Sequence, residues 1–197
     1  MSKDSSLFAD DLSNPDAWME TAEQLLYSAS LMEAEIRVRW GQLKDQIFRE
    51  TPRPKNFIEP ARIQSVFMMV CSFGIENLFK ASIVAKNRAA ILSEATSKGS
   101  LPSIIDGHEL VSLATSAGFK PTVDQEILLR HLTENALWFG RYSMTTKAKN
   151  YTTSRYLSDG SEMHVGTWAE SDIDDVKQLV ESIADDLGCP NPWEAAA

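Results

Sequence analysis

Cysteine is scarce in this sequence, and so are the motifs that hold a cofactor. Only Cys71 and Cys189 occur among the 197 residues, and they lack the paired short spacings of a zinc site or a disulfide framework. We therefore expect two reduced thiols, with Cys71 buried in an apolar run and Cys189 nearer the surface. Because there is also no glycine loop to cradle a phosphate and no nucleophile elbow, neither a cofactor nor a metal is expected.

Long apolar runs are missing as well. No stretch approaches the roughly eighteen consecutive apolar residues that a membrane span needs, and residues 1–16 lack the apolar centre of a signal peptide. These absences predict a cytoplasmic protein with no membrane partner. With 43% hydrophobic residues the chain can bury a core, so we expect a single domain at 15–188 between flexible ends at 1–14 and 189–197.

Positive charge is in deficit, because the formal net charge is −9. This argues against a protein that coats nucleic acid with its whole surface. One segment departs from the deficit, since no acidic residue lies between Glu134 and Asp159. The segment interleaves cations with tyrosines: Arg141, Tyr142, Lys147, Lys149, Tyr151, Arg155 and Tyr156. It can contact the phosphates and stack the bases of a single strand, or instead pack against the acidic last helix.

Helical periodicity is what the sequence has in abundance. Over 18–47 the apolar residues mostly recur every three or four positions, which predicts a long helix that begins at Pro15 and ends before Pro52. A second helix should begin near Pro60 and run to Asn87, and its first half is apolar nearly all round, as in a central helix. Later helices are predicted at 107–118, 123–140 and 171–187.

These elements predict an all-α fold, an up-and-down bundle of about five helices. Residues 141–168 show no sustained period and should form one long polar loop before the last helix, in which the sequence leaves a short hairpin open. The length of the first helix and its wide apolar stripe favour a homodimer.

The stretch "IENLFKA" places Glu76, Asn77 and Lys80 inside an apolar part of the second helix. Glu76 and Lys80 are four residues apart, in the order that favours an ion pair on one helix face. Because a buried charge needs a partner, we expect this pair to reach His108 or Arg141. A structural ion pair is the simpler interpretation, and the alternative is a polar pocket that receives a phosphate or a base.

His108 follows Gly107 at a predicted helix start, where free N–H groups and the positive end of the helix dipole favour an anion. A histidine in that position can also act as a general base near neutral pH. A lone histidine is more often a hydrogen-bonded packing residue, and the sequence alone leaves both interpretations open.

Three stretches in order, "IENLFKA", "GHELVSLA" and "WFGRY", resemble the HEPN superfamily (higher eukaryotes and prokaryotes nucleotide-binding). In that family a helix of the type E-x-x-x-K-A precedes a Thr-His-Asp-Leu-like turn and later an Arg-Tyr-Pro-like element. The resemblance covers about residues 61–145. The chain departs from it at Gly107, Glu109 and Ser143, and it lacks the Arg followed four to six residues later by a His that many HEPN ribonucleases carry, which puts metal-independent RNA cleavage in doubt.

The resemblance implies a homodimeric protein that binds RNA or a nucleotide, of a prokaryotic stress, toxin–antitoxin or phage-defence type. In any cleavage, His108 would act as the base and Arg141 would stabilise the phosphate. The expected ligand-binding residues are Glu76, Asn77, Lys80, Tyr142, Lys147, Lys149, Tyr151 and Arg155. The alternative function is a non-catalytic helical dimerisation or scaffold module that binds a protein partner, such as an antitoxin or a nucleotidyltransferase.

Overall fold

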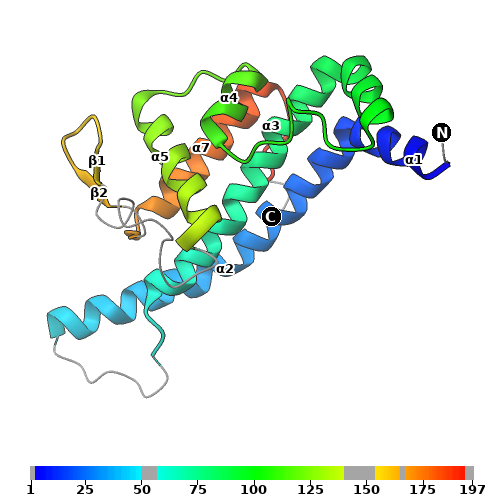
Figure 1. Cartoon of the computed structure of the whole chain (residues 1–197). Helices are drawn as coiled ribbons and strands as arrows, with labels where there is room; N and C mark the ends of the chain where they lie inside the picture. The colour runs from blue at the N-terminus through cyan, green and yellow to red at the C-terminus, as the bar shows by residue number, and fades with distance from the viewer. Residues whose placement is uncertain (1–2, 50–56, 140–153, 165–166, 194–197) are drawn as a thin grey trace.

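The computed structural model describes residues 3–49, 57–139, 154–164 and 167–193. Within these residues the chain is an all-α bundle (Figure 1), so the predicted fold class is confirmed. Its α-helices are α1 (Lys3–Leu12), α2 (Pro15–Arg49), α3 (Pro60–Lys98), α4 (Leu110–Ala117), α5 (Val123–Glu134) and α7 (Asp172–Leu187). A π-helical turn, η1 (Asn135–Phe139), continues α5.

Helices α2 and α3 form the long axis of the fold, and they run side by side in opposite directions (Figure 1). Their close approach depends on Gly74, because a Cβ there would lie 2.6 Å from Cγ of Leu26 on α2. Phe67, Ile75 and Phe79 of α3 are fully buried, and each such side chain contributes roughly 2 kcal/mol through burial. Helices α4, α5 and α7 also pack against α3, which therefore has the central position that its sequence predicts.

Helix α3 continues eleven residues beyond the predicted end at Asn87, since it ends at Lys98. Asn87 itself has non-helical dihedrals, φ −124° and ψ 19°, and its Nδ2 donates to the carbonyl of Ile83 at 2.8 Å. A side chain that donates a hydrogen bond to a carbonyl of the preceding turn can bend a helix. The kink at Asn87 therefore falls where the predicted helix ended. Beyond the kink Ile91 is buried, and Gly99 with φ 63° closes the helix.

Within the predicted flexible end at 1–14, residues Lys3–Leu12 form the helix α1. Ala9 of this helix is fully buried, and the indole Nε1 of Trp18 donates to the carbonyl of Leu12 at 3.0 Å. A tertiary donor thus satisfies a carbonyl that the end of α1 leaves open. Near the C-terminus, the ring of Trp193 packs against the bundle, because it stacks on Phe67 of α3 with ring centroids 6.3 Å apart.

The structure contains a short hairpin within residues 141–168, where the sequence did not decide between a hairpin and a loop. Strand β1 (Ser154–Tyr156) pairs antiparallel with β2 (Glu162–His164) and places Arg155 opposite Met163. Gly160, with φ 85°, lies in the turn between them, where a left-handed conformation favours glycine. The rest of the predicted loop at 141–153 lies outside the described residues.

Within the described residues, α3 alone is long and apolar enough to meet the composition of a membrane-spanning helix. In the most apolar part of α3, 67% of the residues are buried inside the bundle. The core helix of a soluble protein can have the same apolar composition. The predicted location therefore stays a prediction.

Candidate functional site

Three of the predicted site residues meet beside α3. Lys80 Nζ lies 2.7 Å from Glu76 Oε1, and both side chains are buried, at 4% and 9% exposed. His108 Nδ1 lies 3.0 Å and 3.1 Å from the two oxygens of the same carboxylate. The expected ion pair is therefore present and reaches His108. We call these three residues the polar triad.

The segment before α4 holds His108 in place. Helix α4 is capped by Glu109, whose side chain accepts from the backbone N–H of Ser112 at 2.8 Å. The backbone N–H of Leu110 donates to Thr133 Oγ1 at 3.1 Å, which ties the start of α4 to α5. His108 thus precedes the cap, and the expectation that it lies among the free N–H groups of the helix start is wrong, because the Glu109 carboxylate occupies that position.

The contact of His108 with Glu76 uses one ring nitrogen, Nδ1, and leaves the other, Nε2, outside the polar triad. An ionised carboxylate only accepts hydrogen bonds, so the Nδ1–H of His108 donates to Glu76 and fixes the tautomer. The imidazole is 61% exposed, which leaves Nε2 for solvent or a ligand. Lys80 balances the charge of Glu76 and lies 5.6 Å from the centroid of the Trp18 ring. A carboxylate that orients an exposed imidazole can position it as a base or as a hydrogen-bond partner.

Two predicted ligand-binding residues do not join the triad. Asn77 donates through Nδ2 to the carbonyl of Phe73 at 2.7 Å, within its own helix. Arg155 forms a two-pronged ion pair with Glu134, at 3.0 Å and 2.7 Å, so its charge is engaged inside the protein. The remaining predicted residues lie outside the described residues: Arg141, Tyr142, Lys147, Lys149 and Tyr151.

A buried polar seam joins α5 to the segment before α7. His131 is fully buried and stacks on Trp168, with ring centroids 4.2 Å apart. Burial, together with the smaller effect of the Arg155 charge, lowers the pKa of His131 to about 3. Trp168 Nε1 donates to Asn135 Oδ1 at 3.2 Å, and Asn135 Nδ2 donates to the carbonyl of Ser65 at 2.8 Å. Trp168 therefore packs in the interior of the bundle.

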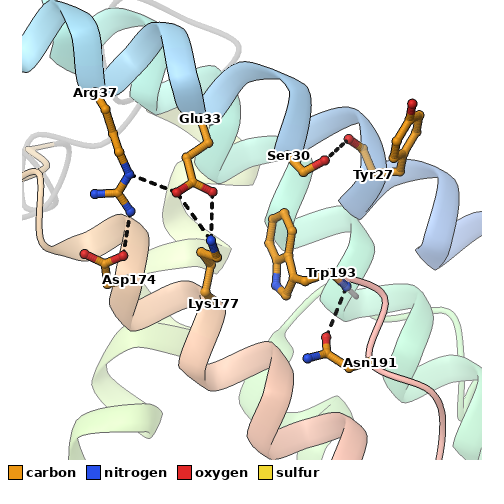
Figure 2. Close-up of polar contacts among 8 residues, drawn as sticks. All are labelled: Tyr27, Ser30, Glu33, Arg37, Asp174, Lys177, Asn191 and Trp193. Atoms are coloured by element: carbon orange, nitrogen blue, oxygen red, sulfur yellow. Dashed lines mark hydrogen bonds and ion pairs between the residues drawn. The ribbon is translucent and has the colours of Figure 1, made fainter. Parts of the chain in front are cut away.

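Helix α7 is joined to α2 by a network of four charged residues (Figure 2). Glu33 lies 2.9 Å from Arg37 Nε and 3.0 Å from Lys177 Nζ, and Arg37 also contacts Asp174 at 2.5 Å. Burial raises the pKa of Glu33, but the hydrogen bonds from Lys177 and Arg37 outweigh it and leave that pKa below its usual value. This is a structural link between two helices.

A cavity of about 790 Å³ opens between the start of α5, the hairpin and the start of α7. Its walls carry Asp124, Asp159, Glu162, Asp172 and Asp175. Burial raises the pKa of Asp172 to about 6, although its bond from the backbone of Ala169 works in the opposite direction. Such a wall disfavours a phosphate, so an anionic ligand would fit the polar triad better. Among the described residues no group of three or more His, Cys, Asp or Glu is placed to hold a metal.

Comparisons with protein-family models, curated proteins and solved structures found no match to this chain. The resemblance to the HEPN superfamily and the functions that it implies therefore stay predictions.

Proposed function

We propose that this chain is a HEPN-like protein that binds RNA, with the polar triad and the basic segment at 141–151 as its contact surface. The observation that supports the proposal is the exposed imidazole of His108 held by the buried carboxylate of Glu76. A fixed tautomer with an outward Nε2 suits a hydrogen bond to a phosphate oxygen or to a ribose hydroxyl.

The positive charge for such a ligand comes from the basic segment. Lys80 is neutralised by Glu76, and Arg155 by Glu134, so neither adds net charge to the site. Arg141, Lys147 and Lys149 supply the positive charge of the basic segment, and Tyr142 and Tyr151 supply rings that stack on bases. In the same proposal, cleavage uses His108 Nε2 to take the proton of a 2′-OH as its oxygen attacks phosphorus, while Arg141 stabilises the phosphate charge. The bond from phosphorus to the 5′-oxygen then breaks, the leaving 5′-oxygen takes a proton from water, and the products are a 2′,3′-cyclic phosphate and a 5′-hydroxyl.

The test is an anisotropy titration of fluorescently labelled single-stranded RNA, repeated across a salt series, with a parallel gel assay for cleavage. His108→Ala and Arg141→Ala should each weaken binding at least tenfold, and affinity should fall steeply with salt. Matched controls are His164→Ala, an exposed histidine on β2, and Arg130→Ala, a surface arginine on α5. Both controls should bind as the unaltered protein does.

The outcomes separate the two functions that the sequence leaves open. Binding that survives both His108→Ala and Arg141→Ala would contradict this site. If the unaltered protein binds no RNA even at low salt, the proposal fails, and the non-catalytic module that binds a protein partner becomes the better explanation.

A further inference from the structure

The outward face of α2 carries apolar side chains that nothing in the described structure covers. Tyr27, Leu31 and Val38 are 46%, 65% and 54% exposed, and Ala34 between them is exposed as well. Their spacing of four, three and four residues places them along one side of the helix. Figure 2 shows Tyr27 directed away from α7. We call these four residues the outer stripe.

The outer stripe lies opposite the buried side of α2. The side chains of Ala22, Leu26, Ala29 and Ile36 of α2 are fully buried, and they attach the helix to the bundle. The outer stripe is thus a second apolar side on a helix whose core side is already satisfied. Exposed apolar residues that are contiguous, unlike scattered ones, commonly mark a surface that associates.

The outer stripe is symmetric about the middle of α2. It is centred between residues 32 and 33, and the helix that runs from Pro15 to Arg49 is centred at residue 32. When two copies of such a helix pair in opposite directions about this centre, Leu31 of each faces Ala34 of the other, and Tyr27 faces Val38. A large side chain then meets a small one at the axis, which allows close packing over the full length of both helices.

Charge supports the antiparallel orientation. The first half of α2, residues 15–30, carries Asp16, Glu20 and Glu23 and no cation, whereas residues 37–49 carry four cations and one acid. The same symmetric register places Asp16 of one copy opposite Arg49 of the other, whose side chain is 75% exposed. Glu20 faces Asp45, but Asp45 already forms an ion pair with Arg49 at 3.2 Å. A parallel pair would instead place the acidic halves together, which is unfavourable.

We propose that the outer stripe binds a second copy of this chain, with the two α2 helices antiparallel about a two-fold axis next to Leu31 and Ala34. The interface is isologous, so each substitution in it acts twice. It lies on a different surface from the polar triad, and the proposal does not depend on RNA binding.

The experiment measures the dimer dissociation constant of the full chain by sedimentation equilibrium. Leu31→Glu should weaken the dimer at least about 100-fold, because it places two like charges next to each other at the axis. The matched control is Val123→Glu, which changes an apolar residue that is 69% exposed on α5, away from α2. The control should dimerise as the unaltered protein does, and circular dichroism should confirm that both variants stay helical.

A charge exchange tests the orientation. Asp16→Arg and Arg49→Asp should each weaken the dimer severalfold, and the two together should restore it, because the opposed charges are then exchanged across the interface. A protein that stays monomeric at about 100 µM, well above the dissociation constants of stable dimers, would overturn the proposal. A dimer that survives Leu31→Glu would also overturn it, because the association would then use another surface.

Discussion

Two ion pairs in this protein have the same sequence spacing and opposite surroundings. Glu33 and Arg37 on α2 are four residues apart, as are Glu76 and Lys80 on α3. The side chains of the first pair are 18% and 33% exposed, whereas those of the second are 9% and 4% exposed. The i, i+4 spacing brings an acid and a base together in both cases, but the packing of the bundle decides how much water each pair keeps.

The difference in burial changes what each pair does. The Glu33 pair extends outward to Lys177 and Asp174, and water screens it, so it should contribute little to stability. The Glu76 pair has lost its water, and each member depends on the other for its charge to be tolerated. The second arrangement holds His108 in a fixed orientation, which is why the candidate site lies there.

The largest expected effect is the loss of the buried partner. Lys80→Met should lower the free energy of unfolding by about 3 kcal/mol, because it leaves the Glu76 carboxylate buried without its ammonium. Urea denaturation at pH 7 measures this. The matched control is Lys98→Met on the same helix, which removes the exposed partner of Glu94 and should leave the urea midpoint nearly unchanged.

A double variant sharpens the same prediction. Glu76→Gln with Lys80→Met removes both buried charges and should recover most of the stability that Lys80→Met loses. His108 would still lose its carboxylate partner, so RNA binding at the proposed site should stay impaired in this variant. If Lys80→Met and Lys98→Met have the same effect, the contrast between the two surroundings is wrong.

Local signals explain how much of this structure the sequence could predict. Thr122 and Gln125 form a capping box with both hydrogen bonds present, and α2 begins at Pro15 and ends before Pro52 as expected. Each of these features is decided within a few residues by dihedral preference and capping chemistry. The meeting of Glu76 with Lys80 is equally local, because one helical turn separates them.

Contacts between distant residues explain what the sequence could not predict. Arg155 pairs with Glu134 only because the hairpin meets the end of α5 in the folded chain. In the same way, the hydrogen bond from the Trp18 indole to the carbonyl of Leu12 depends on how α1 meets α2. No periodic or capping signal encodes them. His131 is the clearest case: its neighbours are typical of a helix, and only its stacking on Trp168 reveals that it is buried.

Burial also affects a single base, His131, and makes the stability of the protein depend on pH. Its pKa is about 3 in the folded protein, so between pH 6.5 and 3 the unfolded chain takes up a proton that the folded chain does not. Stability is therefore full above pH 6.5 and falls on acidification, by about 2 kcal/mol between pH 6.5 and 5. His131→Phe keeps a ring against Trp168 and should remove this slope, measured by urea denaturation at several pH values. Equal slopes in both proteins would contradict the burial of a neutral imidazole.

Asp172 should show the opposite sign, with an effect of similar size. Burial raises the pKa of Asp172 from 3.8 to about 6. The stability that the protonated Asp172 contributes is therefore full below pH 3.8 and is lost as the pH rises through 6. Asp172→Asn can still accept the backbone N–H of Ala169. It should be more stable than the unaltered protein by about 2 kcal/mol at pH 8, with no gain at pH 3.5. Asp186→Asn, an exposed site on α7, is the matched control and should show no such pH dependence.

The smallest expected effect is in the exposed network. Lys177→Met removes one of the two cations on Glu33 and leaves Arg37 in place, so the free energy of unfolding should fall by less than about 1 kcal/mol. The same change should raise the pKa of Glu33 towards its usual value, since the Lys177 hydrogen bond is the largest of the effects that lower it. A carboxyl NMR titration measures this shift. A loss as large as that of Lys80→Met would show that α2 and α7 depend on the network, and that exposure does not separate the two ion pairs.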